Sequence, residues 1–163
     1  MRRVIDKGFK GVCFPCISPA ENPYFEACYD PIWALAQEAG MPVSMYVGCN
    51  AHVPSRLRPP TPDPLAAYAR SAAAIQRTLV ELLCRDVADR FPNLKIVVAE
   101  FNAGWLAHWL ARLDQGVARE NRFGRGPFMA LRPLEIWHRQ FYATIEDGRT
   151  AILTREILGV DNL

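Results

Sequence analysis

The chain has 163 residues, of which 50% are hydrophobic and 22% charged, and this composition excludes a disordered or fibrous protein and fits one globular domain over 1–163. Nineteen Lys and Arg against seventeen Asp and Glu leave a net charge of +2, which is too small to indicate a nucleic-acid or membrane-surface partner. No stretch approaches the roughly 20 apolar residues of a membrane helix, and Asp6, Lys7 and Lys10 interrupt the position of a signal peptide's apolar region, so we expect a cytoplasmic protein.

Gly and Pro punctuate the chain, and between them short apolar runs alternate with segments of helical spacing. In chain order we expect a helix end at 4–7, a strand at 11–17, a helix from Asp30 to Gly40, a strand at 42–47, a long helix at 63–90, a strand at 94–99, a helical stripe at 105–113, a short helix at 133–139, a strand at 141–145, a last helix at 150–158 and the approach to another strand at 160–163. The run at 94–99 lacks polar alternation, as expected of a strand buried on both faces. Strands alternating with helices predict an α/β fold with a parallel sheet, either doubly wound or closed into a barrel.

Candidate site residues are those that follow the strands, because active sites of parallel α/β folds lie at the carboxyl ends of strands. Glu100 is foremost, since a carboxylate directly after a buried strand must be paired, hydrated or used. The structural alternative is an ion pair with an arginine such as Arg112. His52 could be a general base, a metal ligand or a solvated loop residue. The remaining candidates by position are Cys13, Cys16, Tyr46, Gly48, Cys49, Asn102, Glu146 and Asp147.

The five cysteines are an odd number in a chain large enough to build a core, which predicts reduced thiols. Cys13 and Cys16 have the C-x-x-C spacing of a redox pair. Pro19 and Pro23 follow, however, and keep the chain extended where a redox motif would open a helix. We therefore favour two small buried hydrophobic residues at a strand end over a redox module. The four tryptophans, Trp33, Trp105, Trp109 and Trp137, are expected to pack in the core rather than to form a ligand cage.

Several segments occur in a recognisable order: GFKGV at 8–12, DPIW at 30–33, GMPV at 40–43, RFPNLK at 90–95, GWL at 104–106, RLD at 112–114, RPLE at 132–135 and FYATIED at 141–147. In this order they resemble the amidohydrolase-related family. That family groups metal-dependent hydrolases with decarboxylases related to aminocarboxymuconate semialdehyde decarboxylase. The resemblance covers essentially the whole chain.

The resemblance implies a (β/α)8 barrel that binds a divalent metal, usually zinc. The family's metal ligands are an H-x-H pair on the first strand, a histidine after the fifth and an aspartate after the eighth. A barrel of this type needs ~250 residues, so the chain corresponds to a partial barrel of about four βα units. It begins near the helix before the fourth strand and ends where the eighth would start. We therefore expect a fragment that lacks the H-x-H pair and the aspartate.

Two residues depart from the family pattern. Tyr46 stands where the family places its strand-five histidine, and Glu100 stands where many members have a second histidine. The resemblance then implies Glu100 as acid/base or metal ligand, Tyr46 as hydrogen-bond donor or substituted ligand, and His52 as a loop contributor. Glu100 and His52 are the only metal candidates. The residues expected to contact substrate are Asn102, Trp105 and Asp147.

Three functions remain open at this point. The first is a metal-dependent hydrolase acting on a small carboxylated or cyclic substrate, and the second is a metal-dependent decarboxylase of the same family. The third is a catalytically inactive half-barrel that associates with further copies through its exposed sheet edges.

Overall fold

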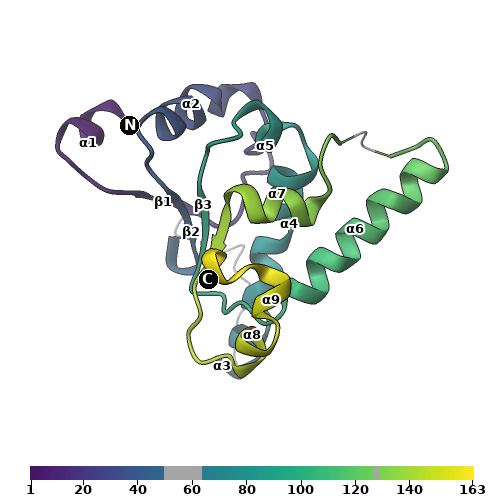
Figure 1. The fold of residues 1–163 in the computed structure, drawn as a ribbon. Coiled ribbons are helices and arrows are strands. Elements are labelled where there is room, and N and C mark those ends of the chain that lie inside the picture. The colour runs from purple at the N-terminus through teal and green to yellow at the C-terminus, as the bar shows by residue number, and fades with distance from the viewer. Residues whose placement is uncertain (50–63, 127–128) are drawn as a thin grey trace.

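A four-stranded parallel sheet forms the centre of the molecule, in a computed structural model that describes residues 1–49, 64–126 and 129–163. Its strands are β1 (Val12–Pro15), β2 (Val43–Tyr46), β3 (Ile96–Ala99) and β4 (Phe141–Ala143). Their order across the sheet, β1-β2-β3-β4, is their order along the chain (Figure 1). A doubly wound sheet reverses its strand order at a switch point, so the observed order selects the barrel type of winding. The four strands form a partial barrel.

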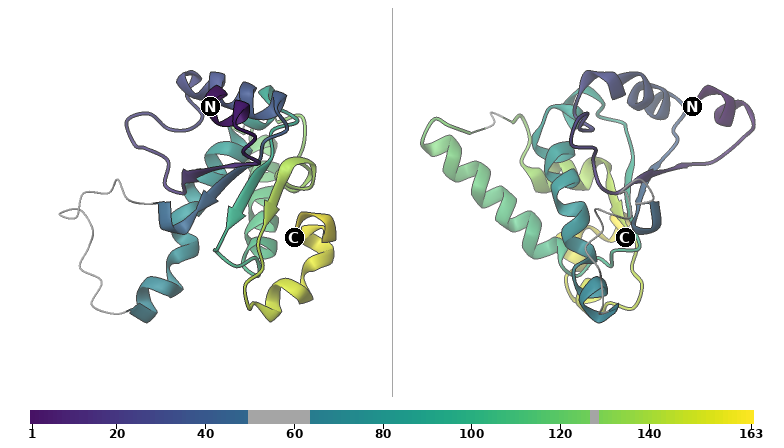
Figure 2. Two further views of the ribbon diagram at one scale, coloured as in Figure 1. Left: turned by 90° about the vertical axis from the view of Figure 1, so that its left-hand side faces the viewer. Right: turned by 180° about the vertical axis from the view of Figure 1, so that it is seen from behind.

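Helices connect the strands, as parallel neighbours require a crossover. They are α1 (Arg2–Asp6), α2 (Asp30–Glu38), α3 (Pro64–Ala69), α4 (Ser71–Cys84), α5 (Val87–Arg90), α6 (Leu106–Arg122), α7 (Pro133–Gln140), α8 (Arg149–Leu153) and α9 (Arg155–Leu158), with 3-10 turns η1 (Ala27–Tyr29), η2 (Val47–Cys49) and η4 (Val160–Asn162). Figure 1 and Figure 2 show α4, α6 and α7 on the same side of the sheet. None of the described helices is long and apolar enough to cross a membrane.

One face of the sheet is fully buried and the other only half-buried. Val43 and Met45 of β2 and Ile96 and Val98 of β3 are buried, whereas the residues between them are only partly covered. The expectation that 94–99 is buried on both faces is therefore wrong for Val97. Parallel strands in the barrel geometry turn alternate side chains toward the helices and toward the barrel interior, and the helices cover the first set.

The core lies between the sheet and the helices. Its largest fully buried side chains are Trp33, Trp137, Phe141, Met45, Ile75, Leu79, Leu82, Leu83, Leu94, Ile96, Leu106 and Leu110. Trp105 and Trp109 are half-buried, with their ring centroids 5.6 Å apart and tilted by 70°. The prediction that the tryptophans serve packing is thus confirmed most fully for Trp33 and Trp137.

A buried polar network ties the segment after β1 to α4. The Thr78 hydroxyl donates to the Cys16 carbonyl oxygen (2.7 Å) and accepts from the Ser18 backbone N–H (2.9 Å). The Trp33 indole N–H donates to the Tyr24 carbonyl oxygen at 3.1 Å. Buried backbone groups outside regular structure need such partners, and here side chains from α2 and α4 provide them.

The structure corrects two predicted elements. The long helix expected at 63–90 is divided, with Arg70 between α3 and α4 and an extended Arg85 after α4. The last helix is split at Thr154, whose hydroxyl donates back to the Thr150 carbonyl oxygen at 2.9 Å and so competes with helix continuation. Residues 160–162 form the 3-10 turn η4, where the Asn162 side-chain amide donates to the Phe141 carbonyl oxygen at 2.8 Å.

Candidate functional site

The carboxyl ends of β2, β3 and β4 bring the main candidate residues to one edge of the sheet. Tyr46 is the last residue of β2 and pairs in register with Ala99, so Glu100 follows directly beside it. Glu146 and Asp147 come a few residues after β4, the neighbour of β3. Figure 1 and Figure 2 show α3 and α8, which flank this edge, at the same end of the molecule.

Tyr46 and Glu100 form a hydrogen-bonded pair. The Glu100 carboxylate accepts a hydrogen bond from the Tyr46 phenol, and this bond, together with the negative charge of Glu100, raises the pKa of Tyr46 above its ordinary value. The phenol therefore keeps its proton at neutral pH. Of the two roles expected for Tyr46, this geometry supports the hydrogen-bond donor over the substituted metal ligand, because a phenol ligates a metal well only when deprotonated.

The backbone after β3 is held in an uncommon conformation. Glu100 has φ of +61° and Asn102 has φ of +53°, and they are the non-glycine residues with positive φ among those described. The left-handed region costs a non-glycine residue about 1 kcal/mol, and such strain gathers at functional sites. The Glu100 N–H donates to the Thr144 hydroxyl at 2.9 Å, which fixes the turn against the segment that follows β4.

The three residues expected to contact substrate also lie together. The Asn102 amide nitrogen donates to Asp147 Oδ1 at 3.2 Å, and the Asn102 amide oxygen accepts from the Ala103 N–H at 2.9 Å. The Trp105 indole N–H donates to the carbonyl oxygens of Phe101 (3.0 Å) and Asn102 (3.1 Å). These hydrogen bonds fix Asn102 and Trp105, which line the cavities at this edge, while Asp147 holds the Asn102 side chain.

Two cavities border this edge. The larger, about 580 Å³, is lined by Val47, Tyr68, Ala69, Ser71, Ala72, Glu100, Phe101, Asn102, Trp105 and Glu146. A smaller one of about 330 Å³ is lined by Asn102, Gly104, Trp105, Gly148 and Thr150. Trp105 and Asn102 form the wall between them. Volumes of this size suit a small molecule.

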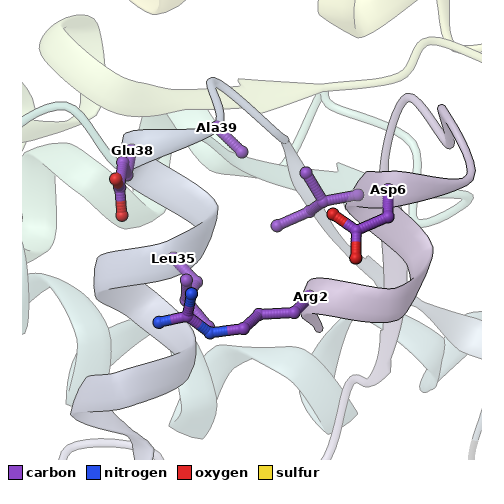
Figure 3. A pocket seen from close by; sticks show the side chains of 6 residues that line it. Arg2, Asp6, Leu35, Glu38 and Ala39 are labelled. Carbon is purple, nitrogen blue, oxygen red and sulfur yellow. The ribbon is translucent and has the colours of Figure 1, made fainter.

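A third cavity, of about 380 Å³, lies between α1 and α2 and is lined by Arg2, Ile5, Asp6, Leu35, Glu38 and Ala39. Figure 3 shows Arg2 and Asp6 on α1 facing α2 across this space. Its lining residues precede β1 and β2 in the chain, so it lies toward the amino-terminal ends of these strands, whereas the candidate residues follow their carboxyl ends. In a barrel the amino-terminal end serves stability rather than chemistry.

The structure also bears on the remaining candidates, namely His52, the alternative partner of Glu100 and the cysteines. His52 lies outside the described residues. In the part of the chain that the structure describes, the partners of Glu100 are Tyr46 and Thr144, so the alternative of an ion pair with Arg112 is not realised. Cys16 is buried as expected, but Cys13 is exposed, because the two residues point to different sides of the extended segment. The five cysteines, all of them among the described residues, form no disulfide bond.

The described residues do not fit a complete metal site. Among residues 1–49, 64–126 and 129–163, no group of three or more His, Cys, Asp or Glu side chains is arranged to hold an ion. At the strand edge, Tyr46 keeps its proton, and Asp147 accepts from Asn102. A zinc or manganese ion needs about four to six donors, and the two carboxylates that line the large cavity, Glu100 and Glu146, fall short of that number.

Sequence reasoning missed two residues of this edge. Tyr68 of α3 lines the large cavity, and Thr144 holds the Glu100 backbone. Tyr68 had no signal beyond its place near the start of an expected helix. Thr144 follows an apolar strand directly, as Glu100 does, and that position could have marked it.

Comparison with known proteins finds a family model and solved structures that match. The family model, described as Amidohydrolase, matches residues 1–133. An amidohydrolase of Mycobacterium avium subsp. paratuberculosis K-10 superposes with a TM-score of 0.74 at 23% identity, over 99% of this chain and 42% of that one. A search of curated proteins gives no match.

Decarboxylases are also among the similar structures. The 5-carboxyvanillate decarboxylase of Sphingomonas paucimobilis has a TM-score of 0.72 at 20% identity, over 98% of this chain and 49% of that one. A dihydroxybenzoic acid decarboxylase of Polaromonas sp. JS666, with bound manganese and the inhibitor 2-nitroresorcinol, has a TM-score of 0.70 at 20% identity, over 99% and 50%. The chain therefore spans half or less of the length of these structures, and the likeness confirms the fold alone.

Proposed function

This chain belongs to the amidohydrolase family, and from that premise we propose that it is the central part of a barrel hydrolase acting on a small carboxylated or cyclic substrate. The observation that carries the proposal is the Tyr46–Glu100 pair beside a cavity of about 580 Å³. A protonated phenol against an exposed carboxylate at the carboxyl ends of parallel strands is a proton-transfer pair in the place where barrel enzymes do chemistry.

Glu100 acts first as a base and then as an acid in this proposal. Its carboxylate takes a proton from a water molecule, and the resulting hydroxide attacks the substrate's carbonyl carbon to give a tetrahedral intermediate. The carbon–nitrogen or carbon–oxygen bond then breaks, and the leaving group receives the proton from Glu100. Tyr46 orients the carboxylate by donating to it, while Asn102, Trp105 and Asp147 shape the substrate wall. His52 remains a predicted loop contributor.

Decarboxylation by the same site is the second candidate, favoured by the decarboxylases among the similar structures. In that reaction, the carbon–carbon bond to a carboxylate breaks, CO₂ leaves, and the carbanion takes a proton from a nearby acid. An assay can tell the two reactions apart by the product released: hydrolysis releases an amine or alcohol, and decarboxylation releases CO₂.

The experiment measures both products. Purified protein is incubated with cyclic amides, esters and carboxylated phenols, and amine, alcohol and CO₂ release are followed separately. Glu100→Gln should lower kcat by about 100-fold or more, since general acid–base groups supply roughly 10²–10⁴. The matched control is Glu156→Gln, whose side chain is 86% exposed on α9. Full turnover by Glu100→Gln, or no product of either kind, would overturn the proposal.

A metal is assayed separately, since the described residues form no site for one. The resemblance implies zinc, whereas manganese is present in the Polaromonas decarboxylase structure. Elemental analysis of protein purified without added metal would identify any divalent ion that the complete enzyme holds. The reduced thiols expected from the cysteines and the cytoplasmic location expected from the interrupted apolar region near the N-terminus belong to the same proposal.

Association of copies is also part of the proposal. Within the described sheet, β1 and β4 each pair with a single neighbour, and an open edge invites pairing with another chain. Sedimentation would show dimers or larger species, and a sharp monomer at high concentration would contradict this.

A further inference from the structure

We propose that the cavity of about 580 Å³ binds the protonated amino group of a small organic ligand. The inference rests on the proposed function and narrows its substrate class to cyclic molecules that carry an amine. Three features of the described lining lead to it: the sign of its charge, its aromatic walls and the way those walls are fixed.

The described lining is negatively charged. Glu100, after β3, and Glu146, after β4, both line the cavity, and both are exposed. No Lys, Arg or His is among the described lining residues. Glu146 has no ion-pair or hydrogen-bond partner among the residues that the structure describes. Two carboxylates from neighbouring strands, with no cation among the described lining residues, attract a positively charged group and repel a carboxylate.

Aromatic side chains form part of the same lining. Tyr68 of α3 and Trp105, just before α6, both border the cavity. The face of an aromatic ring attracts an ammonium group within about 6 Å, and tryptophan does so best. Carboxylates combined with aromatic faces therefore favour an ammonium group attached to an apolar body over a bare metal ion, for which the described residues offer too few ligands.

The aromatic wall is already in position. The Trp105 indole N–H donates to the Phe101 and Asn102 carbonyl oxygens, and the ring rests against Trp109 at 5.6 Å. A side chain held in this way loses little further freedom when a ligand binds, so more of the contact energy appears as affinity. The ring is thus a fixed surface for the ligand's cation.

The test compares three probes of one shape. Benzylamine, benzyl alcohol and benzoate share a ring and differ in charge, and their binding to the full chain is measured by isothermal titration calorimetry. We expect benzylamine to bind about 10-fold tighter than benzyl alcohol, with benzoate weakest. Rising salt should weaken benzylamine and leave benzyl alcohol unchanged, because screening acts on the charged pair.

Variants locate the binding site. Glu146→Gln should weaken benzylamine about 10-fold and leave benzyl alcohol unchanged, while Glu156→Gln on α9 changes neither. Benzylamine should also shift the Trp105 indole N–H signal in the nuclear magnetic resonance spectrum, which is assigned with Trp105→Phe. That spectrum reports on Glu146→Gln as well, so a folding defect in the variant would be visible.

Equal binding of the three probes, tighter benzoate, or an unmoved Trp105 signal would overturn the inference. The proposed function fails separately. Cation binding without any turnover would contradict the hydrolase and leave the cavity's charge preference in place. Hydrolysis of anionic substrates without a preference for benzylamine would contradict only the ammonium site.

Discussion

The polar network after β1 and the edge after β3 place their polar side chains in opposite ways. Behind β1, Thr78 and Trp33 bury their polar atoms on backbone partners, within a core where both side chains are almost fully buried. After β3, Glu100 keeps an exposed carboxylate on a left-handed backbone. The first region gains stability from every contact, whereas the second holds a charged group in a conformation that its own backbone disfavours.

We expect the largest effect on stability from a substitution in the buried region around the segment that follows β1. Trp33→Ala removes a side chain that is 0% exposed and stacks beside Tyr29 with centroids 5.9 Å apart. We expect a loss of ~3–5 kcal/mol in the free energy of unfolding, measured by urea denaturation. Trp105→Ala, on the half-buried site wall, should cost clearly less. Equal losses in the free energy of unfolding for the two variants would contradict the difference between the buried core and the half-buried site wall.

Thr78→Val tests the hydrogen bonds alone, because valine has nearly the shape of threonine. It leaves the Ser18 N–H without its acceptor and the Cys16 carbonyl without its donor. The expected loss is ~1–3 kcal/mol. Thr150→Val is the matched control, since Thr150 is exposed, and it should stay within ~0.5 kcal/mol of the wild type. A cost for Thr78→Val as small as that of the control would show that the network contributes nothing.

Glu100→Gly tests whether the site is strained. Glycine adopts positive φ without cost but adds freedom to the unfolded chain, so we expect stability to stay level or rise by up to ~1 kcal/mol while turnover is lost. Glu38→Gly, at the end of α2 with an exposed side chain, should instead lose ~1 kcal/mol. Thermal melts measure both, and a larger loss at Glu100 than at Glu38 would show that the left-handed turn carries no strain.

The smallest effect concerns thiol reactivity. Burial, helped by the charge of Asp114, raises the pKa of Cys84 to about 11, and only the thiolate reacts. Because the folded state binds this proton more tightly than the unfolded chain, the contribution to stability is complete below the ordinary thiol pKa and is lost as the pH rises to about 11. Labelling followed by mass spectrometry should modify exposed Cys13 and Cys28 first at pH 8. Equally fast labelling of Cys84 would contradict its burial.

Strong local patterns explain what the sequence could predict. The four strands and the parallel connection were visible because Gly and Pro bound short apolar runs, and the segments around Arg90 and Trp105 carried the family resemblance. The breaks at Arg70 and Arg85 were invisible, since no Gly or Pro marks them. The Tyr46–Glu100 pair depends on the register of β2 against β3, which no local pattern encodes. For the same reason, the sequence could not decide against Arg112 as an alternative partner of Glu100.

The hydrogen bond from the Glu100 N–H to the Thr144 hydroxyl joins residues 44 positions apart. During synthesis, Glu100 therefore leaves the ribosome long before its anchor, and its turn cannot settle until β4 has docked. The candidate catalytic residue that follows β3 thus takes its final conformation only when the segment after β4 is in place. A chain that ended before β4 would contain Glu100 but would lack the Thr144 hydroxyl that anchors its backbone.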